Sequence, residues 1–261
     1  MKGIDINQIH PTAIISEKSK IGRRVTIGAN VIIYDNVELE DDIVIGPNSI
    51  MGEPTATFYK DKDYSNPKLR IGAESLIRSG AIIYAGSTIG KCFKCGHRVT
   101  IREKTKIGHH TRIGTLSDIQ GDCYIGNYVR IHSNVHVGQK SSIGNFVWIF
   151  PYVVLTNDPH PPSNILEGVM IEEFAVIAVK AVILSGIRIG KDAIVGAMSL
   201  VRSDVPSEAV VGGNPAKQIT TIRNIKSKYI ESPYPWREHF ERGMPWEGIG
   251  YNEWIKKQYD N

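Results

Sequence analysis

The sequence predicts an all-β solenoid made of very short parallel strands. A branched apolar residue returns at every sixth position from Ile71 to Leu155, and Cys95 is the one non-aliphatic member of that series. Glycine follows directly after many of these residues, and a small or β-branched residue stands four positions after most of them. A period of six fits neither an amphipathic helix nor an alternating strand, so it indicates a repeat architecture.

Three such hexapeptides make one natural coil of eighteen residues with a triangular outline. Each face of the triangle contributes one inward apolar side chain, and residues eighteen apart stack above one another. The period already runs at Ile15 and continues, with two breaks, to Val201. We therefore expect about nine coils in a prism about 40–45 Å long, at roughly 4.8 Å for each strand layer.

The two breaks predict loops that leave the prism at residues 52–70 and 156–170, within a β-helix that spans residues 1–205. The first loop is rich in aromatic and charged residues and the second in proline and asparagine, and loops that depart from a rigid repeat often carry function. Residues 206–261 lack the period but hold three of the four tryptophans. They predict a short, mostly helical C-terminal segment that caps the open end of the stack, where unpaired strand edges would otherwise invite aggregation.

Composition argues against several classes of protein. The chain has 261 residues, a net charge of +4 and 22% charged residues, without a run of five or six like charges, which argues against nucleic-acid binding. No apolar stretch approaches the eighteen residues of a membrane span, and the first residues lack the apolar core of a secretion signal. Three cysteines argue against a disulfide framework and for a reducing compartment. We expect a cytoplasmic protein that does not bind a membrane.

The repeats and the stretch GGNPAK at residues 212–217 resemble the left-handed β-helix acyltransferases with hexapeptide repeats, which close their repeats with a similar stretch. The resemblance covers roughly residues 10–220. It implies a left-handed parallel β-helix, a winding that the period alone does not reveal. It also implies a homotrimer whose active sites lie between neighbouring subunits.

A closer resemblance lies in the stretches GHRVTIREKTKIG, GTLSDIQG, IHSNVHVGQK and WIFPYVVLTNDPHPPS, together with the loop sequence GEPTATFYK. They are similar to N-acetyltransferases of dTDP-linked 3-amino-3,6-dideoxyhexoses. This resemblance implies transfer of acetyl from acetyl-CoA, as co-substrate, to the 3-amino group of the sugar, on the way to surface glycans. Two alternatives stay open: a nucleotide-sugar O-acyltransferase of the lipid A type, and a non-catalytic trimeric β-helical scaffold.

Stacking suggests how catalytic residues meet. Gln139 and Asn157 fall eighteen residues apart on one corner of the prism, and His132 lies beside a second corner. In a three-fold assembly two different corners of adjacent subunits can face one cleft, so His132 of one subunit is expected to face Gln139 and Asn157 of the next. We expect these three side chains to position the amino sugar, with His132 or the departing thiolate accepting the proton.

The other candidate ligand contacts divide into two groups. For the nucleotide, Phe58 and Tyr59 are expected to stack on the base, and Lys60, Arg78 and Arg98 to meet the diphosphate. His97, Asn134 and Asp158 lie at the same corners and complete the substrate-binding set. The resemblance implies a coenzyme A site on the upper coils, with candidate residues Ala178, Lys180, Gly186, Gly196, Ala197 and Lys217.

No metal is expected. Zinc-dependent members of this fold stack two histidines in register, yet His97 is separated from His132 by 35 positions and from His136 by 39, and neither is a multiple of eighteen. Cys92 and Cys95 have the CxxC spacing of a zinc site, but no second pair follows. Cys95 is predicted to fill an inward position of the prism.

Overall fold

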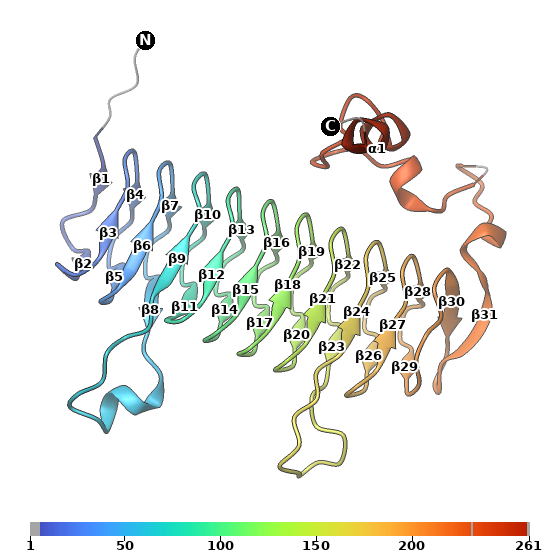
Figure 1. The fold of residues 1–261 in the computed structure, drawn as a ribbon, viewed down its shortest axis with the longest axis horizontal. Coiled ribbons are helices and arrows are strands. Elements are labelled where there is room, and N and C mark those ends of the chain that lie inside the picture. Colours follow the sequence, from blue (N-terminus) through green and yellow to red (C-terminus); the bar gives the residue numbers. More distant parts are fainter. Residues whose placement is uncertain (1–5, 231, 260–261) are drawn as a thin grey trace.

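The computed structural model describes residues 6–230 and 232–259, and their strands wind into a three-sided prism (Figure 1). Strands of successive coils pair in parallel, so that three sheets run the length of the prism, and only the last described strand, Lys217–Thr221, pairs antiparallel with its neighbour. The fold is the predicted left-handed β-helix of hexapeptide repeats, with about 11 turns. The expectation of nine was too low because it left out the first and last strands, Gln8–Ile9 and Ala209–Gly212.

Sheet A forms one face of the prism and contains the first and the last strands of the solenoid. Its strands, in spatial order, are β1 (Gln8–Ile9), β4 (Thr26–Ile27), β7 (Val44–Ile45), β10 (Leu76–Ile77), β13 (Lys94–Cys95), β16 (Arg112–Ile113), β19 (Arg130–Ile131), β22 (Trp148–Ile149), β25 (Val176–Ile177), β28 (Ile194–Val195), β30 (Ala209–Gly212) and β31 (Lys217–Thr221).

Sheet B forms the second face, and both long loops leave from its strands. Its strands are β2 (Ile14–Ile15), β5 (Ile32–Ile33), β8 (Ile50–Glu53), β11 (Ile82–Tyr84), β14 (Thr100–Ile101), β17 (Asp118–Ile119), β20 (His136–Val137), β23 (Val154–Leu155), β26 (Val182–Ile183) and β29 (Leu200–Val201).

Sheet C forms the third face and receives the chain after each loop. Its strands are β3 (Lys20–Ile21), β6 (Val37–Leu39), β9 (Leu69–Ile71), β12 (Thr88–Ile89), β15 (Lys106–Ile107), β18 (Tyr124–Ile125), β21 (Ser142–Ile143), β24 (Met170–Ile171) and β27 (Arg188–Ile189).

The second residue of a typical strand points inward, and these side chains form one continuous core. Ile77, Ile101 and Ile125 are fully buried, and Cys95 takes its predicted inward place. Glycine directly after an inward residue allows the next coil to approach, because a Cβ on Gly114 would lie 2.4 Å from the amide nitrogen of Ser133.

The three corners turn the chain through left-handed backbone conformations that recur every six residues. Non-glycine residues occupy many of them, for example Asn134 with φ 59° and Lys140 with φ 66°. We name the corners by the sheets they join. The A/B corner carries Ser133–Asn134, the B/C corner carries Gln139–Lys140, and the C/A corner carries Asn145–Phe146.

Both predicted loops are present, and both leave the B/C corner on the same side of the prism (Figure 1). The first connects β8 to β9 and contains the short 3₁₀ helix η1 (Ala56–Tyr59), and the second connects β23 to β24. Strand pairing continues across them, with Ile50 opposite Ile82 and Ser142 opposite Met170. The insertions therefore leave the stacking of the coils intact.

The C-terminal segment differs from the mostly helical cap that the sequence predicts. It begins with strands β30 and β31, and its described residues hold one α-helix, α1 (Tyr251–Tyr259), besides the 3₁₀ helices η2 (Ile222–Asn224) and η3 (Trp236–Glu238). The GGNPAK stretch closes the stack, because Gly213 O accepts a hydrogen bond from Leu200 N and Ala216 N donates one to Leu200 O. A tight turn thus supplies hydrogen-bond partners for the backbone groups at the edge of sheet B, where the sequence predicts a helical cap.

After η2 the chain turns back along the prism and packs on the C/A corner instead of its open end (Figure 1). Trp246 is fully buried against the ring of Phe146, with centroids 5.2 Å apart. Arg237 pairs with the buried carboxylate of Asp192 and lies over the ring of Phe174. No helix among the described residues has the length and apolarity needed to cross a membrane.

We expect Trp246→Ala to release this segment while the β-helix stays folded, because coils are stabilised mainly by their neighbours. Loss of a buried tryptophan should cost about 3–5 kcal/mol of docking stability. Limited proteolysis should then cut the chain beyond η2, with the strand signal in circular dichroism unchanged. Tyr229→Ala is the matched control, since Tyr229 lies in the same segment and is 81% exposed. Equal protease resistance of Trp246→Ala and wild type would contradict the docking.

Candidate functional site

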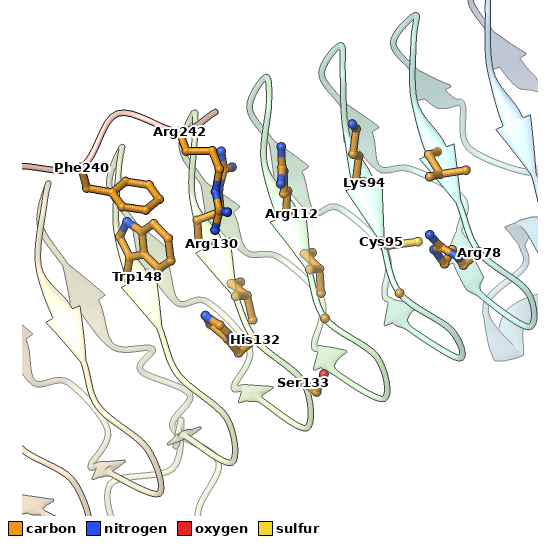
Figure 2. A pocket seen from close by; sticks show the side chains of 15 residues that line it. Arg78, Lys94, Cys95, Arg112, Arg130, His132, Ser133, Trp148, Phe240 and Arg242 are labelled. Atoms are coloured by element: carbon orange, nitrogen blue, oxygen red, sulfur yellow. The ribbon is translucent and has the colours of Figure 1, made fainter. Parts of the chain in front are cut away.

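A cleft runs along the outer face of sheet A under the returning C-terminal segment. Successive strands β13, β16, β19 and β22 place Lys94, Arg112, Arg130 and Trp148 side by side (Figure 2). The cleft has a volume of about 390 Å³, and Arg78, Arg242, Phe240 and His132 also line it. A neighbouring cavity of about 330 Å³ shares its three strand cations and adds Glu74 and Glu247.

Arg130 is the buried member of this cationic row, with 7% of its surface exposed. It donates hydrogen bonds to His110 O at 2.6 Å and to Gly243 O at 2.7 Å, and so ties the C-terminal segment to the prism. Burial, followed by repulsion from Arg112, lowers the pKa of Arg130 to about 10. The cleft therefore combines one buried cation with others that are exposed to solvent.

His132 lies at the end of the cleft nearest the A/B corner. Its ring stacks on Phe150 with centroids 4.8 Å apart and planes 12° apart, and Trp148 lies 6.2 Å away. Burial lowers the pKa of His132, since water solvates the imidazolium form poorly there. His132 is therefore neutral, and able to accept a proton, at pH values where an exposed histidine is still partly charged.

Gln139 and Asn157 stack as the sequence predicts, on the B/C corner between the two loops. A Cβ on Gly138 would lie 3.1 Å from the Cβ of Asn157, so the two coils are in close contact there. Both side chains are half-buried, and neither amide has a hydrogen-bond partner within the described chain. Asn157 O accepts a hydrogen bond from Glu167 N, which closes the base of the second loop. Two half-buried amides without a hydrogen-bond partner among the described residues thus lie in adjacent coils of one corner.

A histidine–carboxylate pair on sheet B is the feature that sequence reasoning missed. His136 Nδ1 lies 3.2 Å from Asp118 Oδ2 on the adjacent strand, and Gln120 Nε2 donates to the same oxygen at 2.6 Å. The hydrogen bond from His136 holds the pKa of Asp118 below its usual value. The separation of eighteen residues between Asp118 and His136 is the signal in the sequence that could have identified the pair. The pair lies on the outer face of sheet B, and the B/C corner residue Gln139 follows His136 by three positions in the chain.

The first loop carries Phe58, Tyr59 and Lys60, which are exposed at its tip. Phe58 packs edge-on against Tyr34, Tyr59 and Tyr64, with centroids 6.3, 5.1 and 5.7 Å away. The buried amide of Asn66 anchors the loop by donating to Gly52 O at 2.8 Å. Two aromatic faces are thus held outward on a fixed base.

The predicted nucleotide contacts are divided within one chain. Arg78 lines the cleft on sheet A, whereas Phe58 and Tyr59 lie beyond the B/C corner. His97, Arg98 and Asn134 occupy the A/B corner, as their spacing predicts. Arg78 and Phe58 are separated because the strand that follows Arg78, β11, lies on sheet B between them.

The side chain of Asp158 stabilises the second loop through hydrogen bonds within the loop. Its carboxylate accepts hydrogen bonds from Ser163 Oγ at 2.6 Å and from the backbone nitrogens of His160 and Ser163. These bonds lower the pKa of Asp158. The same bonds fix the turn of the loop.

The residues expected to bind coenzyme A lie on two corners of the upper coils. Ala178, Lys180, Gly196 and Ala197 lie on or beside the A/B corner, whereas Gly186 turns the chain at the B/C corner with φ 72°. Lys217 begins β31 and lines a separate cavity of about 320 Å³. In a single chain these residues do not form one cavity.

The two halves of the proposed catalytic set therefore lie on the two edges of sheet B. His132 precedes β20 at the A/B corner, and Gln139 follows β20 at the B/C corner. One coil face separates them within a chain. They do not meet within one chain, and their meeting between subunits stays a prediction.

The fold and repeat define a hexapeptide-repeat left-handed β-helix, and residues 104–139 match the family of the bacterial transferase hexapeptide (six repeats). The predicted resemblance is thus confirmed for the repeat and the fold. The chain is similar to 2,3,4,5-tetrahydropyridine-2,6-dicarboxylate N-acetyltransferase of Staphylococcus aureus (strain JH9), with 37% identity over 100 residues. That alignment covers 37% of this chain and 36% of the relative's length.

Solved structures of two acyltransferases share the fold. UDP-N-acetylglucosamine acyltransferase of Arabidopsis superposes with a TM-score of 0.60 at 19% identity, over 97% of this chain and 90% of the other. The enzyme of the same description from Campylobacter jejuni gives a TM-score of 0.59 at 18% identity, over 85% and 79%. The likeness to dTDP-sugar N-acetyltransferases stays a prediction.

We expect His132 to titrate below the ordinary histidine value of 6.5. Phe150→Ala should open the ring to water and move its pKa upward toward that value. The measurement is the pH dependence of the histidine ring signals in NMR. Phe58→Ala is the control, because Phe58 lies in the first loop, away from His132. A His132 pKa at or above 6.5 in the wild type would contradict the burial described here.

Proposed function

We propose that the protein is an acetyl-CoA-dependent N-acetyltransferase that acts on the 3-amino group of a dTDP-linked 3-amino-3,6-dideoxyhexose. The observation that carries this proposal is the pair of unpartnered amides, Gln139 and Asn157, stacked on one corner between two projecting loops. Such amides can both accept hydrogen bonds from a sugar and donate them. The N-acetyltransferase named among the relatives supports an amine as the acceptor.

The active unit is proposed to be a homotrimer in which sheet B of each subunit faces the three-fold axis. Outward positions on sheet B are aliphatic toward both ends, with Ile32, Ile82, Val154 and Val182 half-buried in the single chain and Ile14 exposed. Sheet C instead presents charged and polar residues at most of its outward positions. With sheet B inward, the A/B corner of one subunit meets the B/C corner of the next. His132 then faces Gln139 and Asn157 of its neighbour.

The reaction needs orientation more than activation, because a neutral amine is already a good nucleophile. The amine nitrogen attacks the thioester carbonyl, the new C–N bond forms, and the C–S bond breaks with departure of the coenzyme A thiolate. The backbone N–H of Gln139, which has no partner within the described residues, is available to stabilise the oxyanion. The proton lost by nitrogen goes to the thiolate or to neutral His132.

The same trimer also has surfaces for the thymine base of the sugar nucleotide and for the pantetheine arm of coenzyme A. Phe58 and Tyr59 offer flat faces for the thymine base, with Lys60 nearby in sequence. The corner residues of the upper coils, Ala178 and Gly196 among them, line the path proposed for pantetheine.

A second candidate is O-acyl transfer to a hydroxyl of a nucleotide sugar. The Asp118–His136 pair favours it, because a hydroxyl needs a general base and a carboxylate orients such a histidine. The acceptor decides between the two: a 3-amino sugar nucleotide for the first, and a hydroxyl sugar nucleotide with an acyl carrier protein for the second.

We expect thiol release from acetyl-CoA only when a dTDP-3-amino sugar is present. Asn157→Ala and Gln139→Ala should each lower kcat/KM by at least tenfold through lost positioning. A loss of roughly 10²–10⁴ in His132→Ala would identify a general base, and a few-fold loss a positioning role. His239→Ala is the matched control, since His239 is exposed in the C-terminal segment. The proposal would be contradicted if a screen of 3-amino and 4-amino sugar nucleotides found none that causes thiol release from acetyl-CoA.

We expect a trimer in size-exclusion chromatography with light scattering. Val182→Glu should reduce it to monomers, because it places a charge in the middle of the proposed contact face. Met170→Glu occupies the same strand position on sheet C and should leave the trimer intact. Dissociation by Met170→Glu alone would assign the contact to sheet C instead.

A further inference from the structure

Some charged residues of the prism stand next to an opposite charge in the adjacent coil. On sheet C, Glu38 stands between Lys20 and Arg70 in the pairing register. At the corners, Arg23 pairs with Asp41 at 2.8 Å, eighteen residues away. At these positions the register stacks complementary charges, which stabilises neighbouring coils.

Sheet A instead stacks like charges over three successive coils. Lys94, Arg112 and Arg130 stand directly opposite one another in the register, where like charges destabilise strand pairing. Arg78 and Arg242 add two further cations to the same cleft. Across residues 6–230 and 232–259, no carboxylate forms an ion pair with any of these five. Two acids line the adjoining cavity, and one of them, Glu247, accepts a hydrogen bond from Gly243 N.

The C-terminal segment lies beside this row of cations and closes one side of the cleft. Its residues Phe240 and Arg242 form one wall, and Gly243 fits against the guanidinium groups because a Cβ there would lie 3.2 Å from Arg112 Nη2. Trp148 and Phe240 line both the cationic cleft and an apolar cavity of about 200 Å³ beside it. A cationic channel thus opens directly onto a pocket lined by aromatic side chains.

We propose that this cleft binds a nucleoside diphosphate, with its phosphates among Arg112, Arg130 and Arg242 and its base against Trp148 and Phe240. Guanidinium groups match phosphate oxygens in geometry and charge, and aromatic rings bind bases by stacking. Bound phosphates would supply the anions that the stacked cations lack. Burial and, second, repulsion from Arg112 lower the pKa of Arg130, and a phosphate next to this guanidinium would offset the repulsion.

This site differs from the nucleotide contacts predicted at Phe58 and Tyr59, which lie beyond sheet B on another corner. Two ligands of the proposed reaction carry a nucleoside diphosphate: coenzyme A through adenosine and the sugar substrate through thymidine. The site itself does not depend on that reaction, because ligand binding can be measured without an acyl donor. Failure of acetyl transfer and failure of binding are therefore separate results.

The experiment is calorimetric titration of the intact protein with ADP, dTDP and pyrophosphate. We expect one of the two nucleotides to bind several-fold more tightly than pyrophosphate, because its base adds contacts with Trp148 and Phe240. Tighter binding of ADP would assign the site to the adenosine end of coenzyme A, and tighter binding of dTDP to the sugar nucleotide. The double variant Lys94→Gln/Arg112→Gln should raise the dissociation constant by roughly tenfold or more.

Lys106→Gln is the matched control, since Lys106 is an exposed lysine at the same strand position on sheet C. It should leave the dissociation constant unchanged, and thermal unfolding should report that every variant is folded. The proposal is overturned by an absence of binding, by an equal loss in Lys106→Gln, or by unchanged affinity in the double variant. Equal affinity for pyrophosphate and both nucleotides would overturn the assignment of a base to Trp148 and Phe240.

Discussion

Everything in this molecule depends on the eighteen-residue register of the parallel hydrogen bonds between coils. Because each strand pairs in step with the strand one coil later, a residue's neighbours are fixed by arithmetic along the chain. The register builds the apolar core from inward residues, and it also fixes which side chains meet on the outer faces. Asp118 meets His136, Gln139 meets Asn157, and three cations meet on sheet A for the same reason.

Functional features lie where the chain departs from that regularity. Both loops are inserted at the B/C corner, so the stack continues beneath them while their tips project on one side. The C-terminal segment makes the opposite departure, because after η2 it adds no coil but packs on the C/A corner and lines the cleft on sheet A. A rigid prism with insertions at one corner and a cover on another presents two separate surfaces to ligands.

The sequence predicts most of the solenoid. The six-residue period identifies the inward residues, including Cys95, and the positions of all three corners. The breaks in the period locate both loops, and the stacking of Gln139 on Asn157 follows from their separation. These features depend on local spacing alone, which a single sequence contains in full.

Other features depend on contacts that spacing does not encode. Residues 206–261 have no period, and their path follows from Trp246 and Arg237 finding partners on the C/A corner. Arg78 lies far from Phe58 because a whole face of the prism intervenes. The cationic row and the Asp118–His136 pair do repeat at eighteen, but they lie at outward strand positions, where the period alone does not distinguish a functional side chain from a solvent-exposed one.

The turning back of the C-terminal segment has a consequence for how the solenoid comes apart. A linear stack ordinarily frays from both ends, one layer at a time. Here the last part of the chain is bound to coils in the middle of the stack. Trp246 packs on Phe146, and Arg130 donates a hydrogen bond to Gly243 O. Unfolding from the C-terminal end must first break these contacts with coils in the middle of the stack. The described N-terminal coils have no such contact with the segment, so unfolding should begin there more easily.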